Sequence, residues 1–189
     1  MLTSYFEKEE LRELGLRSYG ENVLISRFAK IYNPDKLIIG NNSRIDDFCI
    51  LTGEISVGSF VHIAPFCLLQ GSEKIVIDDF AGLSSRVSIY SVSEDYTLGL
   101  SLTNPTIPDE FRIIIDKGII VIEKHVLIGS NSIILPNTSI HEGSSIGAFS
   151  LLRGEYESWK IYSGIPAKKV GQRRSKTIVD LEQKLLSKI

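Results

Sequence analysis

Few side chains in this chain could carry proton-transfer chemistry, because it contains only three histidines. His62 directly precedes Ile63 in a stretch typical of a β-strand. Successive side chains of a strand point to opposite faces, so His62 is predicted to point outward where Ile63 points into the core. An imidazole there can accept a proton from an amine or a hydroxyl. We therefore predict a catalytic or substrate-orienting role for His62, with a solvated or interface histidine as the alternative.

Two adjacent carboxylates, Glu94 and Asp95, are alternative proton acceptors. Either one can take a proton directly or orient His62 from a neighbouring subunit, as a paired acid orients a base. The simpler interpretation is a solvated acidic loop. His125 and His141 lie at expected turn positions, so we predict structural roles for both.

A metal centre is not expected. A carbonic anhydrase of the γ type needs three histidines that converge on a metal, and His62, His125 and His141 lack the required close pair. Cys49 and Cys67 are the only cysteines. They are predicted to be two buried or half-buried thiols, typical of a cytoplasmic protein, and not a disulfide or metal site.

A six-residue rhythm of single aliphatic residues indicates the elements that position these groups. It is interrupted by steps of eight residues at 33–36 and 71–74 and by the segment 90–117. This period predicts a parallel β-helix, in which each hexapeptide is one short strand and a turn. The residues in the rhythm are Ile25, Ile31, Ile39, Ile45, Leu51, Val57, Ile63, Leu69, Ile77, Leu83, Ile89, Ile122, Ile128, Ile134, Ile140, Ile146 and Leu152.

Three hexapeptides make one triangular coil, whose faces we call A (containing Ile39), B (Ile45) and C (Leu51). Both steps of eight then fall at the corner between faces C and A. His62 lies on face B, with Arg44 one coil below it and Gly82 one coil above. Because Gly82 has no side chain, it is predicted to leave a gap over the imidazole, as a small-ligand cleft requires.

The segment 90–117 is predicted to be a long loop that leaves the solenoid from face C and returns on face A. A loop of this length inside a regular solenoid is usually functional, and a disordered insertion is the alternative. The chain is predicted to be mainly β in three parts: an N-terminal helical cap (1–20, with the helix at 5–14), the β-helix (21–170) and a C-terminal helix (171–189, with the helix at 175–188).

The overall composition excludes several classes of protein. The net charge of −2 argues against a nucleic-acid-binding or polybasic membrane surface. No apolar run approaches the length of a membrane span, and the acidic first residues do not resemble a signal peptide. A cytoplasmic location is therefore expected.

Three features together resemble the hexapeptide-repeat acyltransferases of the galactoside and xenobiotic acetyltransferase branch. They are the repeats at 122–147, the sequence SGIPAK at 163–168 and the long loop. This resemblance implies a left-handed parallel β-helix, a homotrimer, acetyl-CoA as acyl donor and an active-site cleft between subunits. The stretches 46–50, 62–64, 94–96 and 102–106 resemble, more closely, N-acetyltransferases of bacterial polysaccharide clusters that act on dTDP-4-amino-4,6-dideoxyglucose.

The resemblance implies direct attack of a sugar amine on the thioester, for biosynthesis of a surface polysaccharide such as O-antigen. The chain departs from the galactoside branch in having no histidine in the loop. The expected substrate-binding residues are Arg44, Ser84, Arg86, Tyr96 and Asn104. The expected coenzyme A-binding residues are Gly129, Ser130, Gly147, Ala148, Pro166, Ala167 and Lys168. Surface ion pairs, turns or a solvated tail explain several of these residues equally well.

Two other functions remain open. A sugar O-acetyltransferase of the same family would need a stronger general base, because a hydroxyl is less nucleophilic than an amine. A non-catalytic β-helix that binds a partner is favoured by the missing loop histidine and opposed by the segment 163–168. Binding of acetyl-CoA would discriminate an enzyme from such a binding module.

Overall fold

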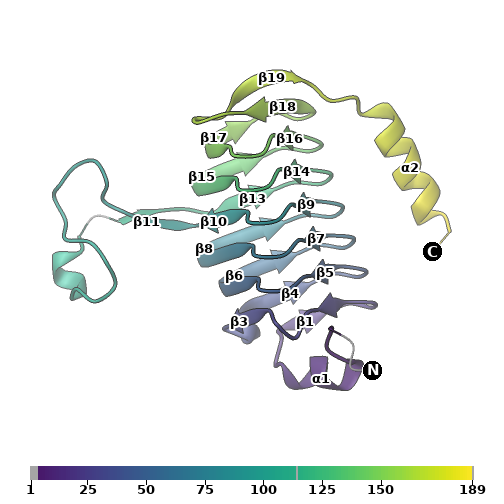
Figure 1. The fold of residues 1–189 in the computed structure, drawn as a ribbon, viewed down its shortest axis with the longest axis horizontal. Coiled ribbons are helices and arrows are strands. Elements are labelled where there is room, and N and C mark those ends of the chain that lie inside the picture. Colours follow the sequence, from purple (N-terminus) through teal and green to yellow (C-terminus); the bar gives the residue numbers. More distant parts are fainter. Residues whose placement is uncertain (1–3, 114, 189) are drawn as a thin grey trace.

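The computed structural model describes residues 4–113 and 115–188. It is a parallel β-solenoid whose coils stack from the N-terminal to the C-terminal end (Figure 1). The predicted mainly β fold and parallel β-helix are confirmed. The first strand already pairs at Ser18, before the predicted start of the solenoid at residue 21.

Three columns of aliphatic residues form the core, as the rhythm predicts. Each column is a run of paired residues in adjacent parallel strands, and all its members except Ile31 are buried. Face A stacks Ile39, Val57, Ile77, Ile122 and Ile140. Face B stacks Ile25, Ile45, Ile63, Leu83, Ile128 and Ile146. Face C stacks Ile31, Leu51, Leu69, Ile89, Ile134 and Leu152.

Faces A and C share one sheet, because some strands bend around the corner between them. β8, for example, runs from Leu68 to Ile77 and contributes to both faces. The strands of this sheet are β1 (Ser18–Tyr19), β3 (Lys30–Tyr32), β4 (Leu37–Ile39), β6 (Ile50–Val57), β8 (Leu68–Ile77), β10 (Ser88–Tyr90), β13 (Ile120–Ile122), β15 (Ile133–Ile140) and β17 (Leu151–Tyr156). A short 3₁₀ helix, η1 (Pro34–Lys36), takes up the first step of eight.

Face B is a separate sheet of short strands. Its last pair, β18 and β19, is antiparallel and closes the C-terminal end of the solenoid. The strands are β2 (Leu24–Ile25), β5 (Arg44–Ile45), β7 (His62–Ile63), β9 (Gly82–Leu83), β14 (Leu127–Ile128), β16 (Ser145–Ile146), β18 (Lys160–Ser163) and β19 (Lys168–Gln172).

The long loop is an arm that leaves after β10 on face C and returns at β13 on face A, as predicted. Its base is an antiparallel pair, β11 (Val92–Glu94) and β12 (Ile115–Lys117), and a 3₁₀ helix, η2 (Asp109–Phe111), lies beyond this base. In Figure 1 the arm projects from the side of the solenoid opposite helix α2. Because β13 pairs directly with β8, the insertion does not interrupt the stack of coils.

Both predicted helices are present. α1 (Lys8–Glu13) covers the first coil with the buried Leu11 and the ion pair between Glu10 and Arg27, at 2.6 Å between Oε1 and Nη1. α2 (Lys176–Leu186) contacts the solenoid through Glu182, which pairs with Lys124 and His125. Neither helix, nor any other in the described residues, is long and apolar enough to cross a membrane.

Candidate active site

A cavity of about 1030 Å³ lies at the base of the arm, where the arm meets the C–A corner of the solenoid. It is partly open to solvent and has both polar and apolar walls. Its lining residues come from β8, β10, β15, β17 and the arm: Gln70, Ser72, Tyr90, Val92, Ser93, Glu94, Asp95, Tyr96, Thr97, Leu98, Pro105, Arg112, Asp116, Leu135 and Arg153.

Glu94 is held in this cavity by Arg112. Arg112 Nη2 donates to Glu94 Oε1 at 2.9 Å, and its Nη1 lies 3.3 Å from Asp109. Within residues 4–113 and 115–188, Glu94 Oε2 and Arg112 Nε are buried and have no hydrogen-bond partner. A buried carboxylate oxygen without a donor is costly, so a hydrogen bond donated to Oε2 would be favourable.

The neighbouring Asp95, the second predicted proton acceptor, forms a turn of the arm. Its carboxylate accepts hydrogen bonds from the backbone N–H groups of Thr97, Leu98 and Leu100 at 3.1, 2.7 and 2.9 Å. The hydrogen bonds from Leu98 and then Leu100 lead the factors that lower the pKa of Asp95. Asp95 therefore shapes the arm, and its role as a proton acceptor stays a prediction.

The two other arm residues expected to bind substrate differ in their surroundings. Tyr96 lines the cavity and is 86% exposed, which leaves its ring free for a ligand. Asn104 Oδ1 accepts from Thr106 N and Thr106 Oγ1 at 3.0 and 2.6 Å, so the Asn104 amide oxygen forms a turn. Of the two expectations, only the one for Tyr96 is supported by the geometry.

A second, smaller hollow of about 270 Å³ lies on face B. The predicted outward column is present, because Arg44 pairs with His62, His62 with Gly82 and Gly82 with Leu127. A Cβ added to Gly82 would lie 3.2 Å from Leu127 Cδ1, so the gap above His62 is narrow. The lining residues are His62, Ala64, Gly82, Leu83, Ser84, Ser85, Leu127 and Ser130.

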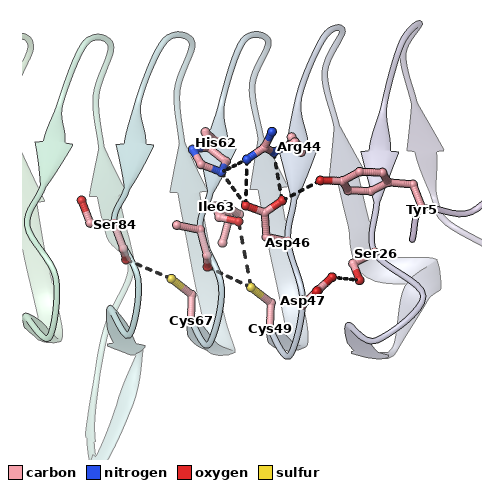
Figure 2. Close-up of polar contacts among 11 residues, drawn as sticks. Tyr5, Ser26, Arg44, Asp46, Asp47, Cys49, His62, Ile63, Cys67 and Ser84 are labelled. Atoms are coloured by element: carbon pink, nitrogen blue, oxygen red, sulfur yellow. Dashed lines mark hydrogen bonds and ion pairs between the residues drawn. The ribbon is translucent and has the colours of Figure 1, made fainter. Parts of the chain in front are cut away.

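His62 is paired with a buried carboxylate that sequence reasoning missed. Figure 2 shows Asp46 between His62, Arg44 and Tyr5. Asp46 Oδ2 lies 2.7 Å from His62 Nε2, and Asp46 Oδ1 lies 2.9 Å from Arg44 Nε and 3.1 Å from Tyr5 Oη. Burial raises the pKa of Asp46, but the hydrogen bonds from His62, Arg44 and Tyr5 outweigh burial and hold this pKa below its usual range.

The two arginines expected to bind substrate both have partners in the chain. Arg44 is bound to Asp46, and the Arg86 guanidinium lies over the Phe66 ring, 4.9 Å from its centroid. Two cations of the arm cavity, Arg112 and Arg153, were missed. No repeat marks them, since Arg112 lies within the arm and Arg153 lies just beyond the last residue of the rhythm.

The two expected coenzyme A glycines have a structural reason to be glycine. A Cβ on Gly129 would lie 2.5 Å from Ala148 N, and one on Gly147 would lie 2.7 Å from Ser163 Oγ. Close stacking of coils therefore requires a glycine at 129, where the backbone of the next coil is met, whereas at 147 only the Ser163 side chain is in the way. Ser130 lines the face B hollow.

The other expected coenzyme A residues lie at the C-terminal end of the solenoid. Ala167 donates its backbone N–H to Leu151 O at 2.8 Å and packs against the core. Pro166 precedes it, and Lys168 begins β19, exposed at the surface.

The remaining two histidines have structural partners. His125 is only 6% exposed, lies between the rings of Phe80 and Trp159, and contacts Glu182 of α2 at 2.8 Å. His141 lies between Glu123 and Glu155, 2.9 Å from each. Among the described residues, no three His, Cys, Asp or Glu side chains are grouped in a way that could hold a metal ion.

Comparison with known proteins relates this architecture to acyl transfer. The family described as bacterial transferase hexapeptide (six repeats) matches residues 119–154. The chain is 43% identical over 182 residues to the dTDP-4-amino-4,6-dideoxy-D-glucose acyltransferase of Escherichia coli, covering 95% of this chain and 93% of that protein.

Two solved structures of AntD, an N-acyltransferase from Bacillus cereus, have the same fold. A variant in complex with dTDP-4-amino-4,6-dideoxyglucose and coenzyme A is 43% identical, with a TM-score of 0.96 and complete coverage of both chains. AntD with dTDP and 3-hydroxybutyryl-CoA is 42% identical, with a TM-score of 0.94 and coverage of 99% of this chain and 98% of AntD. The solenoid, the arm and the sequence identity over nearly the whole chain place this protein in the bacterial hexapeptide-repeat acyltransferase family.

Proposed function

We propose that this protein transfers an acyl group, acetyl in the simplest case, from coenzyme A to the amine of dTDP-4-amino-4,6-dideoxyglucose. The relatives from E. coli and B. cereus support the nucleotide-sugar and the acyl donor. The observation that carries the proposal is the carboxylate of Glu94, which lines a large cavity. Arg112 fixes one of its oxygens, and the other has no partner in the described part of the chain. The product would serve the synthesis of a surface polysaccharide.

In the proposed reaction the neutral amine attacks the thioester carbonyl carbon. A C–N bond forms, the C–S bond breaks, and coenzyme A leaves as a thiolate. The proton lost by nitrogen goes to Glu94 Oε2 and finally to the thiolate. A carboxylate is a weak base, but the N–H proton becomes strongly acidic once nitrogen bonds to carbon, so Glu94 can accept it. Arg112 keeps the carboxylate in place and thereby supplies orientation.

We further propose that the complete site needs two copies of the chain in a homotrimer. The arm cavity and the face B hollow are on different sides of one solenoid, so Glu94 and His62 of one chain serve different sites. A ladder of half-exposed rings, Phe28, Phe48 and Phe66, supplies an apolar contact surface at the B–C corner. Neighbouring rings in it are 5.7 and 5.0 Å apart.

The reaction is tested by incubating the protein with acetyl-CoA and dTDP-4-amino-4,6-dideoxyglucose and measuring free thiol. The product is identified as an amide by NMR. The control acceptor carries a hydroxyl in place of the amine, and 3-hydroxybutyryl-CoA is the alternative donor. Thiol release with the amine acceptor, and none with the hydroxyl acceptor, supports N-acyl transfer. Release with the hydroxyl acceptor alone would establish an O-acyltransferase, and no binding of any acyl-CoA would indicate a binding module.

The shared site is tested by co-expressing Glu94→Gln and His62→Asn chains. If the two residues of one site come from different subunits, mixed trimers regain activity in about a quarter of their sites. If both residues come from the same subunit, mixing restores nothing. Phe48→Glu is expected to dissociate the trimer, because it places charge in an apolar contact. Sedimentation measures this change, and an unchanged trimer would contradict the proposed interface.

A cytoplasmic location is part of this proposal. A nucleotide-sugar and coenzyme A are both intracellular metabolites. The two buried thiols also suit a reducing compartment, since Cys49 and Cys67 are unpaired and contact backbone carbonyls of the next coil.

A further inference from the structure

We infer that Asp46 is a positioning residue that holds His62 in one tautomer, with the proton on Nε2 and with Nδ1 bare towards the face B hollow. The catalytic part of this inference rests on the proposed function, whereas the tautomer does not. Sequence reasoning considered only a carboxylate from a neighbouring subunit as a partner for His62. The structure assigns that role to a residue one coil below in the same chain.

The contact with Asp46 fixes the proton. An ionised carboxylate accepts hydrogen bonds and cannot donate them, and the pKa of Asp46 is held below its usual range, which favours the ionised form. Its Oδ2 lies 2.7 Å from His62 Nε2, so Nε2 must donate. In the neutral imidazole the other nitrogen, Nδ1, then carries a lone pair. In the described part of the chain, nothing hydrogen-bonds to Nδ1.

Arg44 strengthens this arrangement. Its Nη2 lies 3.0 Å from both Asp46 Oδ2 and His62 Nε2. Two donors cannot hydrogen-bond each other, so the contact between Arg44 and Nε2 is a consequence of their shared acceptor, Asp46. Arg44 and His62 therefore both donate to Asp46, and together they hold its carboxylate in one position.

Burial and the N-terminal segment make Asp46 rigid. The Asp46 side chain is 9% exposed, whereas the side chains of Arg44 and His62 are 45% and 47% exposed. Tyr5, which forms an antiparallel bridge with Ser26, donates its hydroxyl to Asp46 Oδ1 at 3.1 Å (Figure 2). The segment before α1 thus helps to orient a group that faces the hollow.

The bare Nδ1 gives His62 a function distinct from that of Glu94. A sugar amine has two N–H hydrogens and one lone pair. If one hydrogen is donated to His62 Nδ1 and the other to Glu94 Oε2, the lone pair is left for the thioester carbon. His62 then orients the amine, and Glu94 takes the proton. A bound acceptor that lacks N–H or O–H at this position would gain nothing from His62.

The tautomer is tested by ¹⁵N NMR of the histidine rings in the wild-type protein, which needs no substrate. The signals are assigned with His62→Asn. We expect Nε2 of His62 to have the shift of a protonated nitrogen and Nδ1 that of a bare one. The opposite pattern, or fast averaging of the two tautomers, would overturn the inference and leave the proposed function standing.

The role of Asp46 is tested with Asp46→Asn and the matched control Asp47→Asn. Asp47 binds Ser26 and not His62 (Figure 2). Asp46→Asn should permit both tautomers and lower kcat about 10- to 100-fold, with KM for acyl-CoA unchanged. Tyr5→Phe should lower kcat only a few-fold, since Asp46 keeps two donors. A single Nε2–H tautomer retained in folded Asp46→Asn would contradict the inference, as would loss of activity in Asp47→Asn alone.

Discussion

Arg112 binds one oxygen of Glu94 at 2.9 Å, and the other oxygen has no partner among the residues that the structure describes, although both residues lie in the same cavity. The ion pair bridges the strand that begins the arm and the segment that returns from it. The two oxygens of the carboxylate therefore differ: the ion pair at Oε1 holds the group in position, and the proposed proton transfer uses Oε2.

Glu94→Gln is predicted to lower kcat by about 10²- to 10⁴-fold, because the amide can still accept from Arg112 but cannot take a proton. Steady-state kinetics should show KM for acyl-CoA within about twofold of wild type. Asp109→Asn is the control, because this exposed residue also contacts Arg112. Equal losses in both variants would indicate that the arm has lost its structure.

Gly82→Ala is predicted to lower kcat/KM for the amino sugar by about 10- to 100-fold, because a methyl group fills the gap between His62 and Leu127. Stability should change little, since the added Cβ meets only the end of a leucine side chain. Ser139→Ala, on the outward side of face A, is the matched control. Full activity of Gly82→Ala would mean that substrate does not use this hollow.

Gly129→Ala is predicted to destabilise the fold by about 1–3 kcal/mol, because the new Cβ would lie 2.5 Å from the backbone nitrogen of Ala148. Denaturant unfolding measures this change. Gly82→Ala serves as the glycine control for stability. A wild-type midpoint for Gly129→Ala would show that the coils separate easily at this corner, and would leave close approach of a cofactor as the reason for the glycine.

The pH dependence of stability is predicted to include a contribution from His141. The hydrogen bond with Glu123 comes first among the causes that raise the pKa of His141, and Glu155 adds to it. Protonated His141 binds these carboxylates in the folded state. Its contribution is therefore complete below the unfolded pKa of about 6.5 and is lost as the pH rises through the higher folded pKa.

His141→Gln should remove this contribution. The loss of unfolding free energy between pH 6 and pH 9 should be smaller in the variant than in wild type, by less than about 1 kcal/mol, because the side chain is 37% exposed and water screens the pair. Parallel stability curves for the two proteins would contradict the prediction.

Glu182→Gln is predicted to loosen helix α2 without unfolding the solenoid. The Glu182 side chain is 10% exposed and joins Lys124 and His125, and charged hydrogen bonds of this kind contribute about 1.5–3 kcal/mol. Hydrogen exchange should quicken in α2 and stay unchanged in the core strands. Asp180→Asn, at an exposed position of the same helix, should have no such effect. Faster exchange throughout the molecule would show that α2 supports the whole fold.

The sequence by itself determined the solenoid, the three core columns and the outward position of His62. These features repeat, and each depends only on the spacing of residues along a strand, so the six-residue period is sufficient to predict them. It also located the arm, because a break in the rhythm is visible without coordinates. Glu94 was identified as a candidate within that break.

Only the tertiary structure decided which groups meet. Asp46 joins His62, Arg44 and Tyr5, the last of which is 41 residues away in sequence. Arg112 reaches Glu94 across the arm, and the Asp95 carboxylate forms a turn within the arm. Such pairings depend on the path of irregular backbone and on side-chain rotamers, which no periodic pattern specifies.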